Sequence, residues 1–186
     1  MIEKTYIIGI TGKMMSGKDT AADYLADALI AQKHQIRKSH LSDPMKEIVK
    51  TIWGKETWSI EGKKAFIVPG LTGRDALQQI SSFFRGLDPQ AWIRAMETYI
   101  KKHDKEQDII IISDVRLPIE TELCDYVLKI DRPSQQSAPK KEQQHETETG
   151  VDEIQPDSIV VNNGSLMQLQ NQMKNLSEII MEKIHD

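Results

Sequence analysis

The chain has 186 residues, 28% of them charged, and a net charge of −4. This length suits one domain with a sizeable core and is too short for two substantial ones. The weakly acidic balance lacks the domain-wide basic field that nucleic-acid-binding proteins use, so we expect no nucleic-acid partner.

Cysteine content and hydropathy indicate the compartment in which the protein works. Cys124 is the single cysteine, which excludes an internal disulfide and a cysteine-based zinc site and suits a reducing compartment. No apolar run approaches the ~20 residues of a membrane span, and the first residues do not resemble a secretion signal. We therefore expect a cytoplasmic protein with no membrane partner.

The N-terminal region predicts a strand, a phosphate-binding loop and a helix. A strand is expected over Thr5–Ile10, and the seven residues from Gly12 to Lys18 fit the pattern G-x-x-x-x-G-K. Glycines let backbone N–H groups approach phosphate oxygens, and the helix that follows directs its positive end at them. We expect four residues of this loop to hold a nucleoside triphosphate, with Lys18 reaching its outer phosphates as a catalytic residue; the four are Gly12, Lys13, Ser16 and Gly17. The alternative interpretation is an ordinary glycine-rich turn.

The residue after the loop lysine departs from the usual pattern. A Ser or Thr that ligates Mg²⁺ is expected there, whereas this chain has Asp19 followed by Thr20. Asp19 could hold the metal through water, or Thr20 could supply the hydroxyl, and the sequence leaves both open. An aspartate beside a triphosphate is repulsive without a cation, so we predict Mg²⁺ dependence.

Helical patterns dominate the region from 43 to about 103. The predicted helix after the loop buries Ala22, Leu25, Ala26, Leu29 and Ile30, and a weaker strand follows near Ile36–Leu41. Three further helices are then expected over Met45–Trp53, Arg74–Phe84 and Pro89–Lys102, with Asp43 as a structural cap before Pro44. Such an insertion over strand ends commonly shapes a second-substrate site. Lys46, Arg74 and Arg85 are its candidate acceptor-binding residues, although each arginine alone, like Arg94, is typical of a solvated surface.

The strand Asp108–Ser113 contains four consecutive isoleucines and predicts a central parallel strand covered on both faces. Asp114 closes it, where a carboxylate can order Mg²⁺ or its waters; an ion pair with a helix is the alternative. Arg116 is predicted to contact phosphates of donor and acceptor.

The C-terminal third predicts two more strands and a helix. Arg132 follows the strand Tyr126–Ile130 and is expected to contact the transferring phosphoryl group. The polar stretch 132–155, which includes Lys140 and Lys141, is either a lid over the phosphates or a solvated surface loop, and composition does not decide between them. The strand Ser158–Val161 leads through Asn162, a candidate ligand of the nucleobase, to a helix capped by Ser165. That helix is expected to bury Leu166, Leu169, Met173, Leu176 and Ile180.

Alternating strands and helices predict an α/β fold of the P-loop NTPase class. We expect a doubly wound parallel sheet of about five strands, with ligands at the carboxyl ends of the strands. Residues 1–186 would form a single P-loop domain with a second-substrate insertion over about 43–103 and a candidate lid over about 132–155.

Several of these segments together resemble bacteriophage deoxynucleoside monophosphate kinases. The resemblance runs in order through Ser16–Asp23, Leu41–Lys46, Trp53-Gly54, Ser113–Arg116, Asp131–Pro133, His145–Gly150 and Val161–Leu166. It implies transfer of the ATP γ-phosphoryl group to a deoxynucleoside monophosphate, with Mg²⁺, on a nucleoside monophosphate kinase fold. The related animal-type phosphomevalonate kinases share S-G-K-D and S-D-x-R. Both families tend to place basic residues in the phosphate loop, where this chain has Met14-Met15 and retains Lys13.

Two other functions fit part of this pattern. A small-metabolite kinase, acting for example on phosphomevalonate, would share the donor site and differ in the acceptor pocket. A nucleotide-binding switch or packaging module would usually carry Ser or Thr after the loop lysine, which this chain lacks. Base preference, ribose against deoxyribose, and monomer against homodimer are left open by the sequence.

Overall fold

The computed structural model describes residues 5–103, 108–133 and 150–185. The described chain divides into two compact units, which we treat separately. The helical unit comprises His40–His103, and the sheet unit comprises the rest. The predicted insertion falls within the helical unit; its role in acceptor binding stays a prediction.

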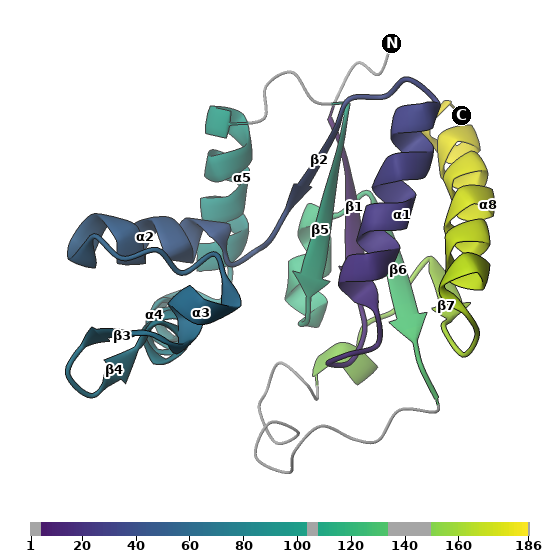
Figure 1. Ribbon diagram of the computed structural model, residues 1–186. Coiled ribbons are helices and arrows are strands. Elements are labelled where there is room, and N and C mark those ends of the chain that lie inside the picture. The colour runs from purple at the N-terminus through teal and green to yellow at the C-terminus, as the bar shows by residue number, and fades with distance from the viewer. Residues whose placement is uncertain (1–4, 104–107, 134–149, 186) are drawn as a thin grey trace. The chain divides into compact units, whose positions relative to one another are not determined.

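Five parallel strands form the core of the sheet unit (Figure 1). They are β1 (Tyr6–Thr11), β2 (Ile36–Ser39), β5 (Ile109–Val115), β6 (Tyr126–Asp131) and β7 (Ser158–Val161), in the order β2-β5-β1-β6-β7. The four isoleucines of β5 are fully buried, as expected of a central parallel strand. The predicted fold class and the five-stranded parallel sheet are thereby confirmed.

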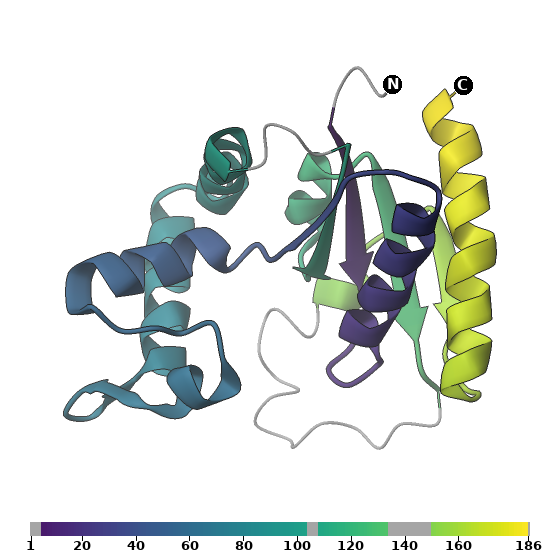
Figure 2. The same ribbon diagram turned by 45° about the horizontal axis from the view of Figure 1, so that its top comes forward.

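Two helices pack side by side on one face of this sheet, α1 (Lys18–Ala31) and α8 (Leu166–His185) (Figures 1 and 2). Their buried residues follow the predicted stripes with two exceptions. Ile30 is 53% exposed and Leu166 is 65% exposed, because each lies in a terminal turn at the limit of its stripe. Ser165 caps α8 as predicted: its N–H donates to Gln168 Oε1, and Gln168 N–H donates to its Oγ.

The opposite face of β1 packs closely against the residues after the 3-10 helix η1 (Pro118–Leu123). A Cβ added at Gly9 would lie 2.4 Å from Cys124 Sγ, so this position needs glycine. Burial raises the pKa of the Cys124 thiol to about 12, which keeps it protonated at neutral pH. Nucleophilic thiolate chemistry is therefore not expected at Cys124.

The strand ends differ from prediction in ways that matter for the site. β5 continues two residues beyond its expected end at Ser113, so Asp114 lies within the strand. Gly9 pairs with Ile112 but Thr11 pairs with Val115, so Ser113 and Asp114 together oppose the single residue between Gly9 and Thr11. This β-bulge lies at the carboxyl end of the sheet, where bulges re-aim side chains toward a site.

The helical unit contains four helices and a short hairpin. Its elements are α2 (Asp43–Trp53), α3 (Ile60–Lys64), β3 (Phe66–Val68), β4 (Leu71–Thr72), α4 (Gly73–Leu87) and α5 (Ala91–His103). Its buried core consists of six side chains: Met45, Val49, Ile67, Ala76, Leu77 and Trp92. The sequence did not predict α3 or the hairpin. The predicted cap at Asp43 is wrong by one residue: Ser42 is the N-cap and Asp43 is the first residue of α2. The Asp43 carboxylate accepts from His40 N–H, which ties the preceding turn to the helix start.

Candidate phosphate-binding site

The phosphate loop runs from Gly12 to Gly17, between β1 and α1. Gly12 has φ 147°, and an added Cβ would lie 2.4 Å from the Ile130 carbonyl oxygen. Gly17, the N-cap of α1, is left-handed with φ 95°, and its added Cβ would lie 2.5 Å from Asn162 Nδ2. Both motif glycines thus have a conformation that favours glycine, and each lies too close to a neighbouring group for a Cβ: the Ile130 carbonyl at Gly12 and the Asn162 side-chain amide at Gly17. The first turn of α1 directs its N–H groups into the loop, which suits an anion.

Two buried hydroxyl groups lie at this loop without a partner in the described residues. Ser16 is 2% exposed and Thr11 is fully buried, and neither side-chain oxygen makes a hydrogen bond there. Buried polar atoms are nearly always satisfied, so each such exception calls for an explanation. A phosphate oxygen or its bound water would provide the missing partner, and these atoms therefore fit the polyphosphate of a nucleotide.

The two lysines of the loop have different environments. Lys18 is 8% exposed and its Nζ donates to the Lys13 carbonyl at 2.8 Å, which folds the ammonium group back over the loop. Lys13 Nζ lies 3.0 Å from Asp152 Oδ2 in η2 (Gly150–Asp152), and both side chains are more than half exposed. An exposed pair of this kind contributes little stability. The geometry therefore favours Lys18 over Lys13 as the cation inside the loop.

Met15 adds conformational strain at the tip of the loop. It has φ 61°, a left-handed conformation that non-glycine residues rarely adopt, and it is 72% exposed. Such strain, of order 1–3 kcal/mol, occurs chiefly at functional sites. Met15 and its neighbour Met14 replace the basic residues of the resembling families, so the loop itself supplies only Lys13 and Lys18 as cations.

The predicted metal residues lie at the start of α1 and the end of β5. Asp19 is exposed and its Oδ1 accepts a hydrogen bond of 3.0 Å from Ser113 Oγ. Thr20, the next residue of α1, and Asp114, within the bulge, are each partly buried. In the described part of the chain, no three His, Cys, Asp or Glu residues form a metal cluster. This arrangement fits Mg²⁺, which proteins usually bind through one or two carboxylates together with substrate phosphates.

Arg116 and Arg132 follow the strands on either side of β1. β5 and β6 both pair with β1 in parallel, so the residues after all three strands meet at one edge of the sheet. Glu120 orders the chain at Arg116, because its Oε2 accepts from Arg116 N–H at 2.8 Å and from Leu117 N–H at 3.0 Å. The sequence analysis missed Glu120, although the Leu117-Pro118 start followed by a glutamate is a helix-capping signal. Arg132 is exposed.

Most of the predicted lid lies outside the described residues. Residues 134–149, which contain Lys140 and Lys141, are not described. The C-terminal end of the predicted lid, from Gly150 on, is described. Val151 is fully buried and Gly150 packs against the Arg116 carbonyl, so this end is anchored beside the predicted catalytic arginine.

Asn162 joins the phosphate loop to the turn after β7. Its Nδ2 donates to the Ser16 carbonyl at 2.9 Å, and its backbone N–H donates to the Asp131 carbonyl at 2.6 Å. A cavity of about 230 Å³ opens beside it, lined among others by Asn163, Gly164 and Gln172. Amide groups and glycine backbone suit the hydrogen-bonding edge of a nucleobase. Asn162 thus contacts the loop directly, and its own contact with a base stays a prediction.

The predicted acceptor residues belong to the helical unit. Lys46 is 2% exposed and forms a buried ion pair with Asp43 at 2.6 Å. Burial alone would raise the pKa of the Asp43 carboxyl, but the hydrogen bond and charge of Lys46 outweigh it and lower that pKa. Arg74 and Arg85 lie eleven residues apart on α4, about three turns, and therefore on the same face of the helix.

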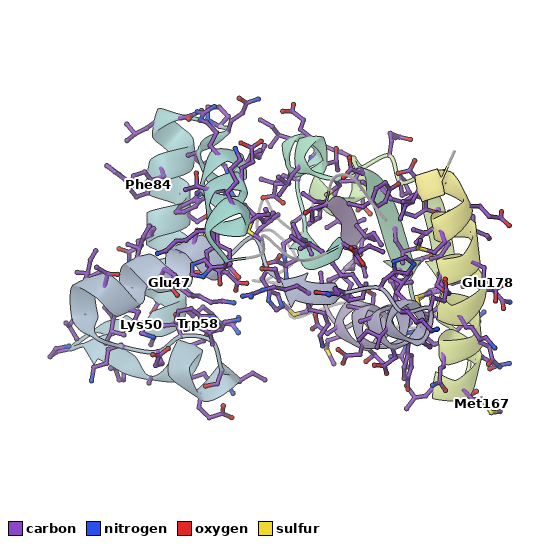
Figure 3. All side chains as sticks on the ribbon, turned by 90° about the horizontal axis from the view of Figure 1, so that it is seen from above. Glu47, Lys50, Trp58, Phe84, Met167 and Glu178 are labelled. Atoms are coloured by element: carbon purple, nitrogen blue, oxygen red, sulfur yellow. The ribbon has the colours of Figure 1, made fainter. Side chains whose placement is uncertain are left out.

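Arg94 and Trp58, also in the helical unit, have partners within that unit. Arg94 pairs with Asp88 and donates to Gln90 Oε1, so it stabilises the start of α5. Trp58 is 37% exposed, and Lys50 Nζ lies 5.6 Å from its ring centroid. Both residues are labelled in Figure 3. Lys46 Nζ lies 6.0 Å from the same centroid, so the Trp58 ring faces two lysine cations.

Part of the chain matches one known protein family. The family model described as "Deoxynucleotide monophosphate kinase" matches residues 83–173, just under half of the chain. This segment holds Asp114, Arg116, Arg132 and Asn162 and begins after the phosphate loop. No curated protein matches the chain.

Several solved structures match most of the chain at low sequence identity. TT1252 from Thermus thermophilus has a TM-score of 0.50 at 16% identity, over 97% of this chain and 98% of that one. The Mycobacterium tuberculosis APS kinase CysC Cys556Ala mutant has a TM-score of 0.48 at 13% identity, over 94% of this chain and 98% of that one. A sugar kinase from Janibacter sp. HTCC2649 has a TM-score of 0.48 at 16% identity, over 96% of this chain and 95% of that one.

These findings confirm two predictions from the sequence. The chain resembles the deoxynucleotide monophosphate kinases, and it is a phosphotransferase with a nucleotide-binding P-loop. In the described residues, no helix is long and apolar enough to cross a membrane.

Proposed function

We propose that this phosphotransferase moves the γ-phosphoryl group of ATP to a deoxynucleoside monophosphate, giving ADP and a deoxynucleoside diphosphate, with Mg²⁺ as cofactor. The family match supports a deoxynucleotide acceptor. The observation that carries the donor site is the phosphate loop itself. Its glycines accept no Cβ, and its Ser16 hydroxyl is buried without a partner in the described chain.

The residues act by positioning and by charge. Phosphoryl transfer has a loose transition state, so the protein contributes alignment and electrostatic stabilisation rather than covalent chemistry. Residues Gly12 to Thr20 hold the donor, and Lys18 places an ammonium group at its outer phosphates. Arg116 and Arg132, from the strands flanking β1, stabilise charge on the transferring group.

Mg²⁺, when bound, would neutralise charge on the β- and γ-phosphates. Asp19, Thr20 and Asp114 are the residues that would hold it, directly or through water. No general base is required, because the acceptor phosphate is already ionised at neutral pH.

For the acceptor we propose the cations of the helical unit. Arg74 and Arg85 present two guanidinium groups on one face of α4, and guanidinium matches phosphate in a two-point contact. Lys46 is a second candidate for the acceptor phosphate. In the described structure the Lys46 ammonium donates to the Asp43 carboxylate, so on binding the acceptor it would contact this carboxylate and the phosphate together.

A coupled assay of ADP release tests this proposal. Each of the four common deoxynucleoside monophosphates is supplied with ATP and Mg²⁺, and ribonucleoside monophosphates and phosphomevalonate are run in parallel. We expect ADP formation with at least one deoxynucleotide, lost in Lys18→Met and retained in Lys174→Met, which removes an exposed lysine of α8. Activity with phosphomevalonate alone would support a small-metabolite kinase, and no ADP with any deoxynucleotide would reject the proposed acceptor.

A further inference from the structure

We infer that Ser113 is a positioning residue for the Asp19 carboxylate, and that their hydrogen bond orients this carboxylate for Mg²⁺ or its waters. The inference rests on the proposed function, because it concerns the site of Mg²⁺ beside the nucleotide. It adds Ser113, which the sequence analysis did not assign to the site.

The usual protein ligands of Mg²⁺ in phosphate-loop enzymes are a hydroxyl on the helix and a carboxylate on a neighbouring strand. In phosphate-loop enzymes the Ser or Thr after the loop lysine and an Asp near the end of a neighbouring strand hold Mg²⁺. In this chain the residue after Lys18 is Asp19, and the end of β5 supplies Ser113. A carboxylate therefore replaces the usual hydroxyl after the loop lysine, and Ser113 lies beside Asp114, the carboxylate near the end of β5.

The structure joins these groups directly. Ser113 Oγ donates to Asp19 Oδ1 at 3.0 Å, across 94 positions of sequence. Ser113 is only 6% exposed, so its hydroxyl needs a partner, and Asp19 provides it. Asp19 itself is exposed, so its carboxylate is accessible from solvent.

The β-bulge explains how Ser113 reaches this position. Ile109 and Ile111 lie in the core shared with α1, and Ser113 continues their alternation toward the helix. The extra residue then lets Val115 pair with Thr11, so Ser113 and Asp114 occupy the bulge together. A bulge at this point keeps Ser113 against α1 without changing the buried pairing before it.

A fixed carboxylate matters for this particular metal. Mg²⁺ demands near-ideal octahedral geometry, so a ligand that rotates freely binds it less well. A hydroxyl that donates to one carboxylate oxygen limits rotation and leaves lone pairs for the metal or its waters. Loss of such an outer partner typically reduces metal affinity by about 10- to 100-fold.

Calorimetry of ADP binding, with and without Mg²⁺, tests the inference. The measured quantity is the Mg²⁺-dependent gain in ADP affinity. For Ser113→Ala we expect this gain to fall by about tenfold, while metal-free ADP affinity changes less than about twofold. Ser113→Thr keeps the hydroxyl and should keep the gain. Ser177→Ala removes a fully buried hydroxyl from α8 and should also keep it. Circular dichroism establishes whether each of these variants is folded.

Two results would overturn the inference. They are a full gain in Ser113→Ala and an equal loss of metal-free and metal-bound affinity in that variant. If the unmodified protein binds no nucleotide, the proposed function fails and this inference with it. If it binds Mg²⁺ and ADP but Ser113→Ala behaves normally, only this inference fails.

Discussion

Gly12→Ala is the substitution for which the structure predicts the largest effect in the phosphate loop. The new Cβ would lie 2.4 Å from the Ile130 carbonyl oxygen, below the 3.0 Å that real Cβ atoms maintain. Because that oxygen belongs to the backbone of β6, the loop or the strand end must move. The substitution also places alanine at φ 147°, which L-residues rarely adopt.

The two costs can be estimated separately. The unfavourable backbone conformation costs about 2 kcal/mol, and the steric overlap costs about 2 kcal/mol more. For a chain of this size a loss of about 4 kcal/mol lowers the melting temperature by roughly 12 °C. We also expect MgATP affinity, measured on the folded protein at low temperature, to fall at least about tenfold, since displaced N–H groups lose charge-assisted bonds to phosphate.

Gly54→Ala is the matched control for the backbone term. Gly54 has φ 64°, and an added Cβ there meets nothing within 4 Å. Its loss should be only about 1 kcal/mol, measured by urea unfolding, and MgATP affinity should not change. The reasoning is refuted if Gly12→Ala and Gly54→Ala lose equal stability, or if Gly12→Ala binds MgATP normally.

Three further predictions follow from contacts near the loop and in the helical unit. Asn162→Ala removes the bond to the Ser16 carbonyl and should weaken MgATP binding about fivefold; equal affinity by calorimetry would contradict this role. Met15→Gly relieves a left-handed residue and should raise unfolding free energy by about 0.5 kcal/mol in urea titrations, whereas a decrease would show that the methionine side chain stabilises the loop. Asp43→Asn leaves the buried Lys46 ammonium without its carboxylate and should cost about 3 kcal/mol. Lys46 lowers the pKa of Asp43 in the folded state. The stability from this ion pair is therefore fully present above the ordinary pKa of 3.8 and is lost as pH falls through the folded-state pKa. The free energies of unfolding of the unmodified protein and of Asp43→Asn, measured against pH, should converge below the folded-state pKa, and parallel curves would refute the assignment.

Local patterns were sufficient to predict the phosphate loop and the sheet. The loop motif, the run Ile109–Ile112 and the periodic apolar residues of α1 and α8 each report on their own neighbourhood in sequence. They therefore identified the strands and the two covering helices. Boundaries were less certain, because the end of β5 depends on a bulge against β1 that no local pattern encodes.

The contacts that organise the site could not be predicted in this way. The bond from Ser113 to Asp19 spans 94 positions and that from Asn162 to Ser16 spans 146, so both require the strand order to be known. The β3–β4 hairpin was missed because strands of three and two residues show no periodicity. The Pro69-Gly70 pair between them is nevertheless a turn signal that could have indicated it.

Titration of MgATP into the unmodified protein and into Lys18→Met, followed by calorimetry, is the most direct test of the phosphate loop as the donor site. We predict binding at one site per chain in the unmodified protein and a loss of at least about tenfold in affinity in Lys18→Met, because one charge-assisted contact is worth roughly 1.5 kcal/mol or more. Absence of heat with the unmodified protein, or identical binding by the two proteins, would contradict the account.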